Sequence, residues 1–133
     1  MKIPEFLHLG TQAYENTYEQ MRSLVKAESF QDQVWLLEHP SVFTLGTAAD
    51  PSNILNPGDI PVIQTDRGGE VTFHGPGQLV IYFLLDIKSK KIGPKTLVAN
   101  LQLIIQKVLQ HYSIESSFIE GAPGVYVENK KIA

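Results

Sequence analysis

The spacing of hydrophobic side chains predicts two amphipathic helices. Over residues 14–25 and again over residues 94–112, apolar and aromatic side chains recur three or four positions apart, which places them on one face of a helix. Pro94 fits the first turn of the second helix, because the N–H that proline lacks has no helical partner there. The side chains that mark these faces are Tyr14, Thr17, Tyr18, Met21, Leu24 and Val25, then Leu97, Val98, Leu101, Ile104, Ile105, Val108, Leu109 and Tyr112.

Short β-prone runs predict strands between and after the helices. The run 79–86 is expected to be the central strand, because it is apolar on both faces and so suits a strand that is covered from both sides. A proline- and glycine-containing stretch over 50–59 predicts a surface loop with room for a short helical turn. The predicted strands are 33–38, 41–45, 60–65, 79–86, 114–119 and 124–127.

Helices interspersed with strands predict one α/β (or α+β) domain over residues 1–133, with helices against a mixed sheet. A chain of 133 residues is long enough for one domain with its own core. It stops at Ala133, at the start of an apolar strand and within an expected hairpin. From this pattern we expect the domain to be incomplete at its C-terminus.

Composition narrows the class of protein. Hydrophobic residues make up 43% of the chain and charged residues 19%, which is typical of a globular protein. The formal net charge is -3, so there is no basic excess to favour nucleic-acid binding. The longest apolar run, 79–85, is far shorter than the ~20 residues of a membrane-spanning helix, and no apolar signal region follows Lys2. We therefore expect a cytoplasmic protein with no membrane partner.

The densest polar segment is residues 66–78, which contains four glycines. Glycines let a backbone approach a ligand closely and leave its N–H groups accessible. Thr72 and His74 lie on the same side if this stretch is extended, and Gln78 opens the apolar strand that follows. Such a rim suits a ligand with a polar head and an apolar tail. The alternative is purely structural, with glycines in turns and a histidine that satisfies a core hydrogen bond.

Several common sites are excluded by spacing. A dinucleotide-binding site is excluded, because Val80 occupies the position at which its Gly-x-Gly-x-x-Gly motif needs the third glycine. The sequence also has no phosphate-binding loop motif and no Gly-x-Ser-x-Gly motif of the serine hydrolases. The four histidines lack helical metal-ligand spacing, so no metal site is expected. The lysines at 88, 90, 91 and 95 indicate either a solvated loop face or a docking patch for an acidic protein.

The glycine-rich segment closely resembles the signature of the octanoyltransferases, also called lipoate-protein ligase B. Two flanking runs agree with that family, 36–46 and 122–127, the second followed by Lys131-Ile132-Ala133. The resemblance covers nearly the whole chain. The signature residues are Arg67, Gly68, Gly69, Thr72, Phe73, His74, Gly77, Gln78 and Tyr82.

The resemblance implies an acyltransferase of lipoate biosynthesis with the α/β fold of biotin and lipoate ligases. Such enzymes take an octanoyl group from octanoyl-acyl carrier protein and pass it to a lysine of a lipoyl domain in a 2-oxoacid dehydrogenase complex or of the glycine cleavage H protein. The reaction runs through a cysteine thioester and implies no cofactor, and the full-length protein is expected to be a monomer. A thiolate attacks a thioester readily, and a nearby ammonium group favours the thiolate.

Residue by residue, the resemblance implies that Lys131 lowers the thiol pKa, because it directly precedes Ile132-Ala133. The alternative for Lys131 is an exposed lysine at the end of a strand. The family's cysteine follows the Lys-Ile-Ala run and is absent from this chain, which we therefore expect to be inactive alone. The residues expected to line the acyl pocket are Arg67, Gly68, Gly69, Glu70, Val71, Thr72, Phe73 and His74.

Two other functions remain open. The first is an ATP-dependent lipoate or biotin ligase of the same fold. Such ligases are expected to carry a longer arginine–glycine run ending in Tyr-His-Asp, whereas the order here is Thr72-Phe73-His74-Gly75, which favours octanoyl transfer. The second is a non-catalytic module that binds an acyl group or a protein partner.

Overall fold

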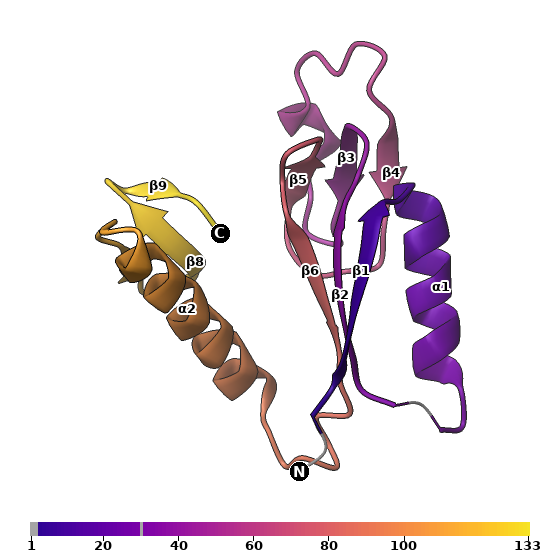
Figure 1. Cartoon of the computed structure of the whole chain (residues 1–133). Helices are drawn as coiled ribbons and strands as arrows, with labels where there is room; N and C mark the ends of the chain where they lie inside the picture. The colour runs from indigo at the N-terminus through magenta and orange to yellow at the C-terminus, as the bar shows by residue number, and fades with distance from the viewer. Residues whose placement is uncertain (1–2, 30) are drawn as a thin grey trace. The chain divides into compact units, whose positions relative to one another are not determined.

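The computed structural model describes residues 3–29 and 31–133 and divides into two compact units, Met1–Leu85 and Asp86–Ala133. Each unit has its own helix and its own β-structure (Figure 1). Within the described residues, no helix is both long enough and apolar enough to cross a bilayer. The sequence predicted a single domain over 1–133, and that stays a prediction.

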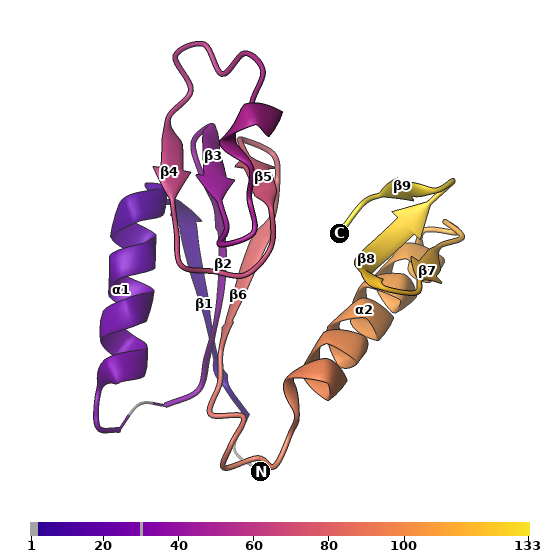
Figure 2. The ribbon, with the colours of Figure 1, turned by 180° about the vertical axis from the view of Figure 1, so that it is seen from behind.

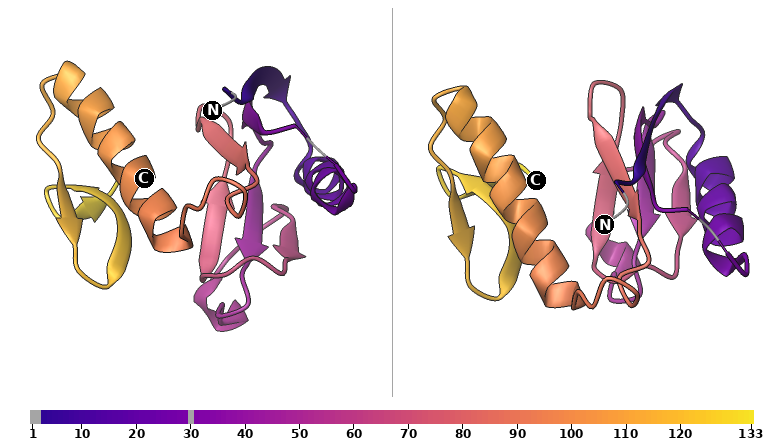
Figure 3. Two further views of the ribbon diagram at one scale, coloured as in Figure 1. Left: turned by 90° about the horizontal axis from the view of Figure 1, so that it is seen from below. Right: turned by 60° about the horizontal axis from the view of Figure 1, so that its bottom comes forward.

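The first unit is built on a three-stranded mixed sheet in the order β1-β2-β6. Strand β1 (Glu5–Thr11) runs parallel to β2 (Gln33–Glu38), and β6 (Val80–Leu84) runs antiparallel to β2. Helix α1 (Tyr14–Lys26) lies along this sheet (Figures 1 and 3). Its side chains Met21 and Leu24 pack against the cluster formed by Trp35, Leu37, Val80 and Leu84. Burying this apolar face is what holds the helix on the sheet.

A second mixed sheet in the first unit has the order β4-β3-β5 (Figure 2). Strand β3 (Val42–Leu45) is central, parallel to β4 (Val62–Gln64) and antiparallel to β5 (Val71–His74). The loop between β3 and β4 contains one 3-10 turn, η1 (Pro51–Asn53). The sheet therefore places the glycine-rich motif on β5 and on the turns at both of its ends.

The second unit consists of helix α2 (Pro94–His111) and an antiparallel sheet in the order β7-β8-β9. The strands are β7 (Ser117–Ile119), β8 (Ala122–Val127) and β9 (Lys130–Lys131). Figure 2 shows α2 lying along this sheet. The side-chain amides of Gln102 and Gln106 on α2 donate to the carbonyl oxygens of Gly124 and Ser116, at 2.8 and 3.3 Å.

Both predicted helices and all six predicted strand regions are confirmed, with ends shifted by a few residues. The predicted central position of 79–86 is wrong. Strand β6 lies at the edge of its sheet within the described part of the chain, and β2 is central. Phe83 and Leu79 remain 37% and 62% exposed, whereas Val34 and Trp35 on β2 are buried on opposite faces. An apolar run indicates contact with other apolar groups but does not give the order of strands.

Strand β1 was not predicted from the sequence. Its usable signal is the alternation of Leu7 and Leu9, which pack toward the core while Phe6 stays exposed. Gly10, at φ +64°, lies where the register with β2 shifts, and this interrupts the alternation. A short parallel strand gains its stability from β2, more than twenty residues away, so local pattern indicates it weakly.

Gly46 fixes the approach of the turn at residues 67–70 to the end of β3. A Cβ atom at this buried position would lie 2.1 Å from the carbonyl oxygen of Gly69 and 2.9 Å from Nη1 of Arg67. The backbone N–H groups of Thr47 and Ala48 donate to the carbonyls of Arg67 and Gly69, at 2.9 and 3.2 Å. The two segments pack backbone to backbone, and only glycine leaves room for this contact.

We expect Gly46→Ala to lower the free energy of unfolding by about 1–3 kcal/mol, because the added methyl group overlaps backbone that cannot turn aside. Urea denaturation measures this change. Gly68→Ala is the matched control, since a Cβ there meets nothing within 4 Å, and its effect should stay within about 0.5 kcal/mol. Equal losses in the two variants would contradict the close packing of Gly46.

Candidate active site

Arg67 joins the glycine-rich turn to the sheet. Its Nη2 donates to the carbonyl oxygen of Thr44 at 3.0 Å, to Oγ1 of Thr44 at 2.7 Å and to the carbonyl oxygen of Glu70 at 2.9 Å. Its Nη1 donates to the carbonyl oxygen of Gly68 at 2.9 Å. Thr44 is completely buried. The guanidinium therefore bridges Thr44 of β3 to the carbonyl groups of Gly68 and Glu70 in the turn.

The neighbouring Asp66 links the same turn to helix α1. Its carboxylate accepts a hydrogen bond from the hydroxyl of Tyr18 and forms an ion pair with Arg22 at 3.2 Å. Both members of the ion pair are about half exposed, so the pair contributes little to stability. The contacts of Asp66 instead fix the position of the motif, because they hold its first residues between β3 and α1.

Strand β5 carries the middle of the motif. Val71, Thr72, Phe73 and His74 pair with residues 42–45 of β3, and the alternation of the strand places Thr72 and His74 on one side, as the sequence predicted for an extended segment. After β5 the chain turns over Gly75-Pro76-Gly77-Gln78, with φ of +84° at Gly77 and Gln78 N–H donating to the Gly75 carbonyl at 3.1 Å. Glycine after proline at this position is what a type II turn requires.

The turn at 75–78 orients His74. Nδ1 of His74 lies 2.6 Å from Oε1 of Gln78, and Nε2 of Gln78 donates to the Phe73 carbonyl at 3.3 Å. The Gln78 oxygen is thus the acceptor, so Nδ1 of His74 carries the proton. In the neutral ring Nε2 is then an acceptor. The carboxylate of Glu38 accepts from the Gly77 N–H at 2.8 Å and holds the turn against β2.

Behind this turn lies a hydrogen-bonded chain of Tyr82, His39 and Gln12. His39 is completely buried. Its Nδ1 lies 2.7 Å from the Gln12 carbonyl oxygen and must donate, so its Nε2 accepts from the Tyr82 hydroxyl at 2.9 Å. The chain ties β6 to the segment that links β1 to α1.

The rings of four residues from four segments form one cluster, which we call the aromatic cluster: Tyr14, His39, His74 and Tyr82. The ring of Tyr14 stacks on that of His74 with centroids 6.1 Å apart and meets that of His39 edge-on at 5.2 Å. The ring of His39 lies 5.6 Å from that of His74 and 5.9 Å from that of Tyr82. His74 and Tyr82 of the motif therefore belong to one site.

Burial keeps three rings of this cluster uncharged at neutral pH. It lowers the pKa of His39 below its usual value, an effect that the hydrogen bond to Gln12 partly offsets. Burial also raises the pKa of Tyr14, against the opposing influence of Arg67, and raises that of Tyr82 well above its usual range. A neutral wall of rings beside an arginine already bonded to carbonyls suits an uncharged acyl chain better than a phosphate.

Lys131 belongs to the second unit. It pairs with Tyr126 across the β8–β9 hairpin, and Lys130 pairs with Val127, so the two lysines point to opposite faces of the strand. Lys131 borders a cavity of about 230 Å³ whose other walls include Val98, Leu101 and Ile105 of α2. The distinction that the sequence drew between Lys130 and Lys131 thus has a counterpart in the structure.

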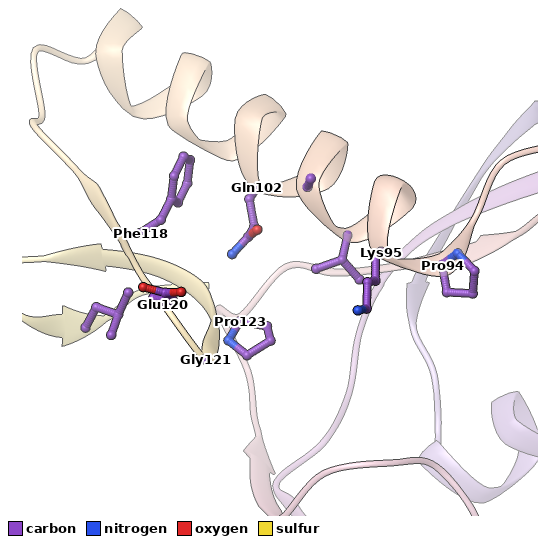
Figure 4. Close-up of a pocket in the computed structure, with 10 residues that line it drawn as sticks. Pro94, Lys95, Gln102, Phe118, Glu120, Gly121 and Pro123 are labelled. Atoms are coloured by element: carbon purple, nitrogen blue, oxygen red, sulfur yellow. The ribbon is translucent and has the colours of Figure 1, made fainter.

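A larger cavity of about 630 Å³ lies between α2 and the β7–β8 connection of the same unit (Figure 4). Gln102 and Lys95 extend into it from α2, while Phe118 and Pro123 face them from the sheet. All the residues that line this cavity belong to the second unit. Among residues 3–29 and 31–133, no three histidine, aspartate or glutamate side chains lie close enough to hold a metal ion.

The motif residues were predicted from the sequence, but two of their partners were missed. Tyr14 was assigned only to a helix face, and His39 fell between the predicted strands 33–38 and 41–45. The sequence carried no signal for the burial of His39, because a histidine followed by Pro40 between two β-prone runs is expected in a turn or bend. The roles predicted for residues 67–74 and for Lys131 stay predictions.

Two curated proteins are similar in sequence to this chain over most of its length. An octanoyltransferase of Shewanella halifaxensis is 53% identical over 128 residues, which is 95% of this chain and 58% of the relative. An octanoyltransferase of Legionella pneumophila is 49% identical over 128 residues, covering 95% of this chain and 64% of the relative. The predicted resemblance to the octanoyltransferases is confirmed. The chain spans about three-fifths of the length of these relatives.

A solved structure supports the fold. The bipartite lipoate protein ligase of Thermoplasma acidophilum matches with a TM-score of 0.60 and 15% identity, over 94% of this chain and 51% of that one. The predicted α/β fold of the lipoate ligases is therefore confirmed. The family model for the lipoyl protein ligase A/B catalytic domain matches residues 12–133, and on this evidence the chain belongs to that family.

Proposed function

We propose that the protein transfers an octanoyl group from octanoyl-acyl carrier protein to a lysine of a lipoyl domain. The observation that carries the proposal is the gathering of the octanoyltransferase signature, from Arg67 to Tyr82, around one aromatic cluster. The first unit then provides the acyl pocket, with residues 67–74 as its lining. The protein acts in the cytoplasm, as a monomer and without a cofactor.

The reaction runs in two steps through a cysteine that lies outside this chain. The cysteine thiolate attacks the octanoyl thioester of the carrier protein, forms an octanoyl-enzyme thioester and releases the carrier's thiol. The lysine amine of the lipoyl domain then attacks this thioester, which forms an amide and returns the cysteine thiol. The chain itself contains no cysteine, so it does not carry out the first step alone.

Lys131 supplies the positive charge that favours the thiolate. An ammonium group within ~4–6 Å of a thiol lowers its pKa by stabilising the anion. The apolar wall formed by Val98, Leu101 and Ile105 beside Lys131 strengthens such an interaction, because it excludes water from one side of the charge.

Protein substrates are recognised in part by the charge of the second unit. Between residues 87 and 114 the chain has no aspartate or glutamate, while five lysines fall in this stretch: Lys88, Lys90, Lys91, Lys95 and Lys107. Clustered positive charge speeds the encounter with an acidic protein. For Lys88, Lys90, Lys91 and Lys95 we therefore propose the docking-patch interpretation, with an acidic carrier protein or lipoyl domain as the partner.

The proposed function predicts octanoyl transfer without ATP. A protein that includes the cysteine should move octanoate from octanoyl-acyl carrier protein to a lipoyl domain, which intact-mass measurement detects. The 133-residue chain, which lacks cysteine, should gain no hydroxylamine-labile octanoyl adduct. Transfer of free octanoate that needs ATP would instead identify a ligase, and tight binding of the carrier protein without turnover would identify a binding module.

The proposed acyl pocket can be tested by introducing a larger side chain at a glycine where the fold has room for it. A Cβ at Gly68 meets nothing within 4 Å, whereas Gly69 has a φ of +92°, which a side chain would strain. Gly68→Val should therefore slow transfer by about tenfold or more, equivalent to about 1.4 kcal/mol, while the free energy of unfolding changes by less than about 0.5 kcal/mol. Transfer kinetics and urea denaturation measure the two effects. Parallel losses of stability and activity would show that the turn is structural.

The role of Lys131 is tested against its neighbour. In the protein with the cysteine, Lys131→Ala should raise the thiol pKa measured by alkylation by about one unit or more, toward ~8.5. It should also slow formation of the acyl-enzyme at neutral pH. Lys130→Ala removes the same charge from the opposite face of β9 and should shift the pKa much less. If both variants shift it equally, or neither does, Lys131 does not have this role.

A further inference from the structure

Gly124 lies on the same face of the β8–β9 hairpin as Lys131. Side chains alternate along β8, so residues 124 and 126 share a face, and Lys131 sits opposite Tyr126 on that face. The neighbouring position along the diagonal is Gly124, whose φ is +146°. A long side chain at 131 is thus placed beside a position that has no side chain of its own.

The side chain of Lys131 occupies the space over Gly124. A Cβ at residue 124 would lie 2.6 Å from Cε and 3.3 Å from Cδ of Lys131, and 2.7 Å from the carbonyl oxygen of Ala133. Cβ atoms are not found this close to another heavy atom, so any residue other than glycine must displace both the lysine stem and the Ala133 carbonyl. The path of the lysine over β8 therefore exists only because residue 124 is a glycine.

Helix α2 borders the Lys131 side chain on the side opposite Gly124. Gln102 extends from α2 toward the start of β8 (Figure 4), and its Nε2 donates to the Gly124 carbonyl at 2.8 Å. Gly124, Gln102 and Lys131 all border the same 230 Å³ cavity, together with Val98 and Leu101. The hydrogen bond fixes the separation of helix and strand at the residue over which the lysine stem passes.

We propose that Gly124 is a positioning residue for Lys131, with Gln102 fixing its distance from α2. A free lysine side chain samples many rotamers, and its ammonium group has no fixed place. The open space over Gly124 admits the rotamers that carry the lysine stem across β8 toward α2, and a Cβ at residue 124 would exclude them. This inference rests on the proposed function for its consequence, which is that Gly124 sets how well the Lys131 ammonium stabilises a thiolate.

The experiment compares Gly124→Ala with Gly121→Ala. Gly121 has a φ of +75°, and a Cβ atom there would meet nothing within 4 Å, so this control introduces backbone strain without touching Lys131. Nuclear Overhauser contacts between the ε-methylene of Lys131 and the α-protons of residue 124 are measured in the 133-residue chain. Gly124→Ala should abolish them, and Gly121→Ala should retain them. Retention in both variants would overturn the inference.

A second variant covers the case in which Gly124→Ala prevents folding of the unit. Gln102→Leu removes the hydrogen bond to the Gly124 carbonyl without adding atoms to the space over Gly124, and it should weaken the same contacts of Lys131. Unchanged contacts in a folded Gln102→Leu protein would overturn the assignment of Gln102 and, where Gly124→Ala is unfolded, the inference with it.

Alkylation of the thiol separates this inference from the proposed function. In the protein that includes the cysteine, Gly124→Ala should raise the thiol pKa by about one unit, as Lys131→Ala does, and the double variant should add no further shift. If Lys131→Ala raises the pKa but Gly124→Ala does not, the positioning role fails and the proposed function stands. If the Lys131 contacts are lost in Gly124→Ala but neither variant shifts the pKa, the positioning role stands and the proposed role of Lys131 fails.

Discussion

The contact of Arg67 with the end of β3 is the constraint on which the geometry of the first unit's site depends. A single guanidinium nitrogen bonds both the carbonyl and the hydroxyl of the buried Thr44, and the contact is possible only because Gly46 leaves room for the turn at 67–70. That turn sets where β5 begins, and with it the place of His74. A charged side chain fixes backbone here, because one guanidinium can donate several hydrogen bonds to carbonyl oxygens of the strand and of the turn at once.

The polar groups of the two candidate sites differ in their exposure to solvent. In the first unit, His39 and Tyr82 bond to each other in the interior, and burial keeps both neutral, since a charge there would lose its hydration. In the second unit, Lys131 stays exposed and only its stem packs, over Gly124. Neutral rings suit the recognition of an uncharged chain, whereas an ammonium group suits the stabilisation of an anion.

Much of the fold could be predicted because it is encoded locally. The helices follow from side chains repeated at helical spacing, and β2 and β3 follow from short β-prone runs around Pro40. Strand β1 and the edge position of β6 could not be predicted, because both depend on which strand pairs with β2. Pairing partners are distant in the chain, and their choice is made by the packing of the whole sheet.

The sequence by itself determined the chemistry that is available, namely a motif with Arg67, His74 and Tyr82, a lysine before Ile132-Ala133, and no cysteine. These features follow from residue type and spacing alone. Only the tertiary structure decided which groups meet. It brought Tyr14 and His39 to the motif, and it placed the stem of Lys131 over Gly124. It also determined, through their hydrogen-bond acceptors, that Nδ1 carries the proton in both His39 and His74. Contacts between distant segments arise from burial and shape, which local sequence does not encode.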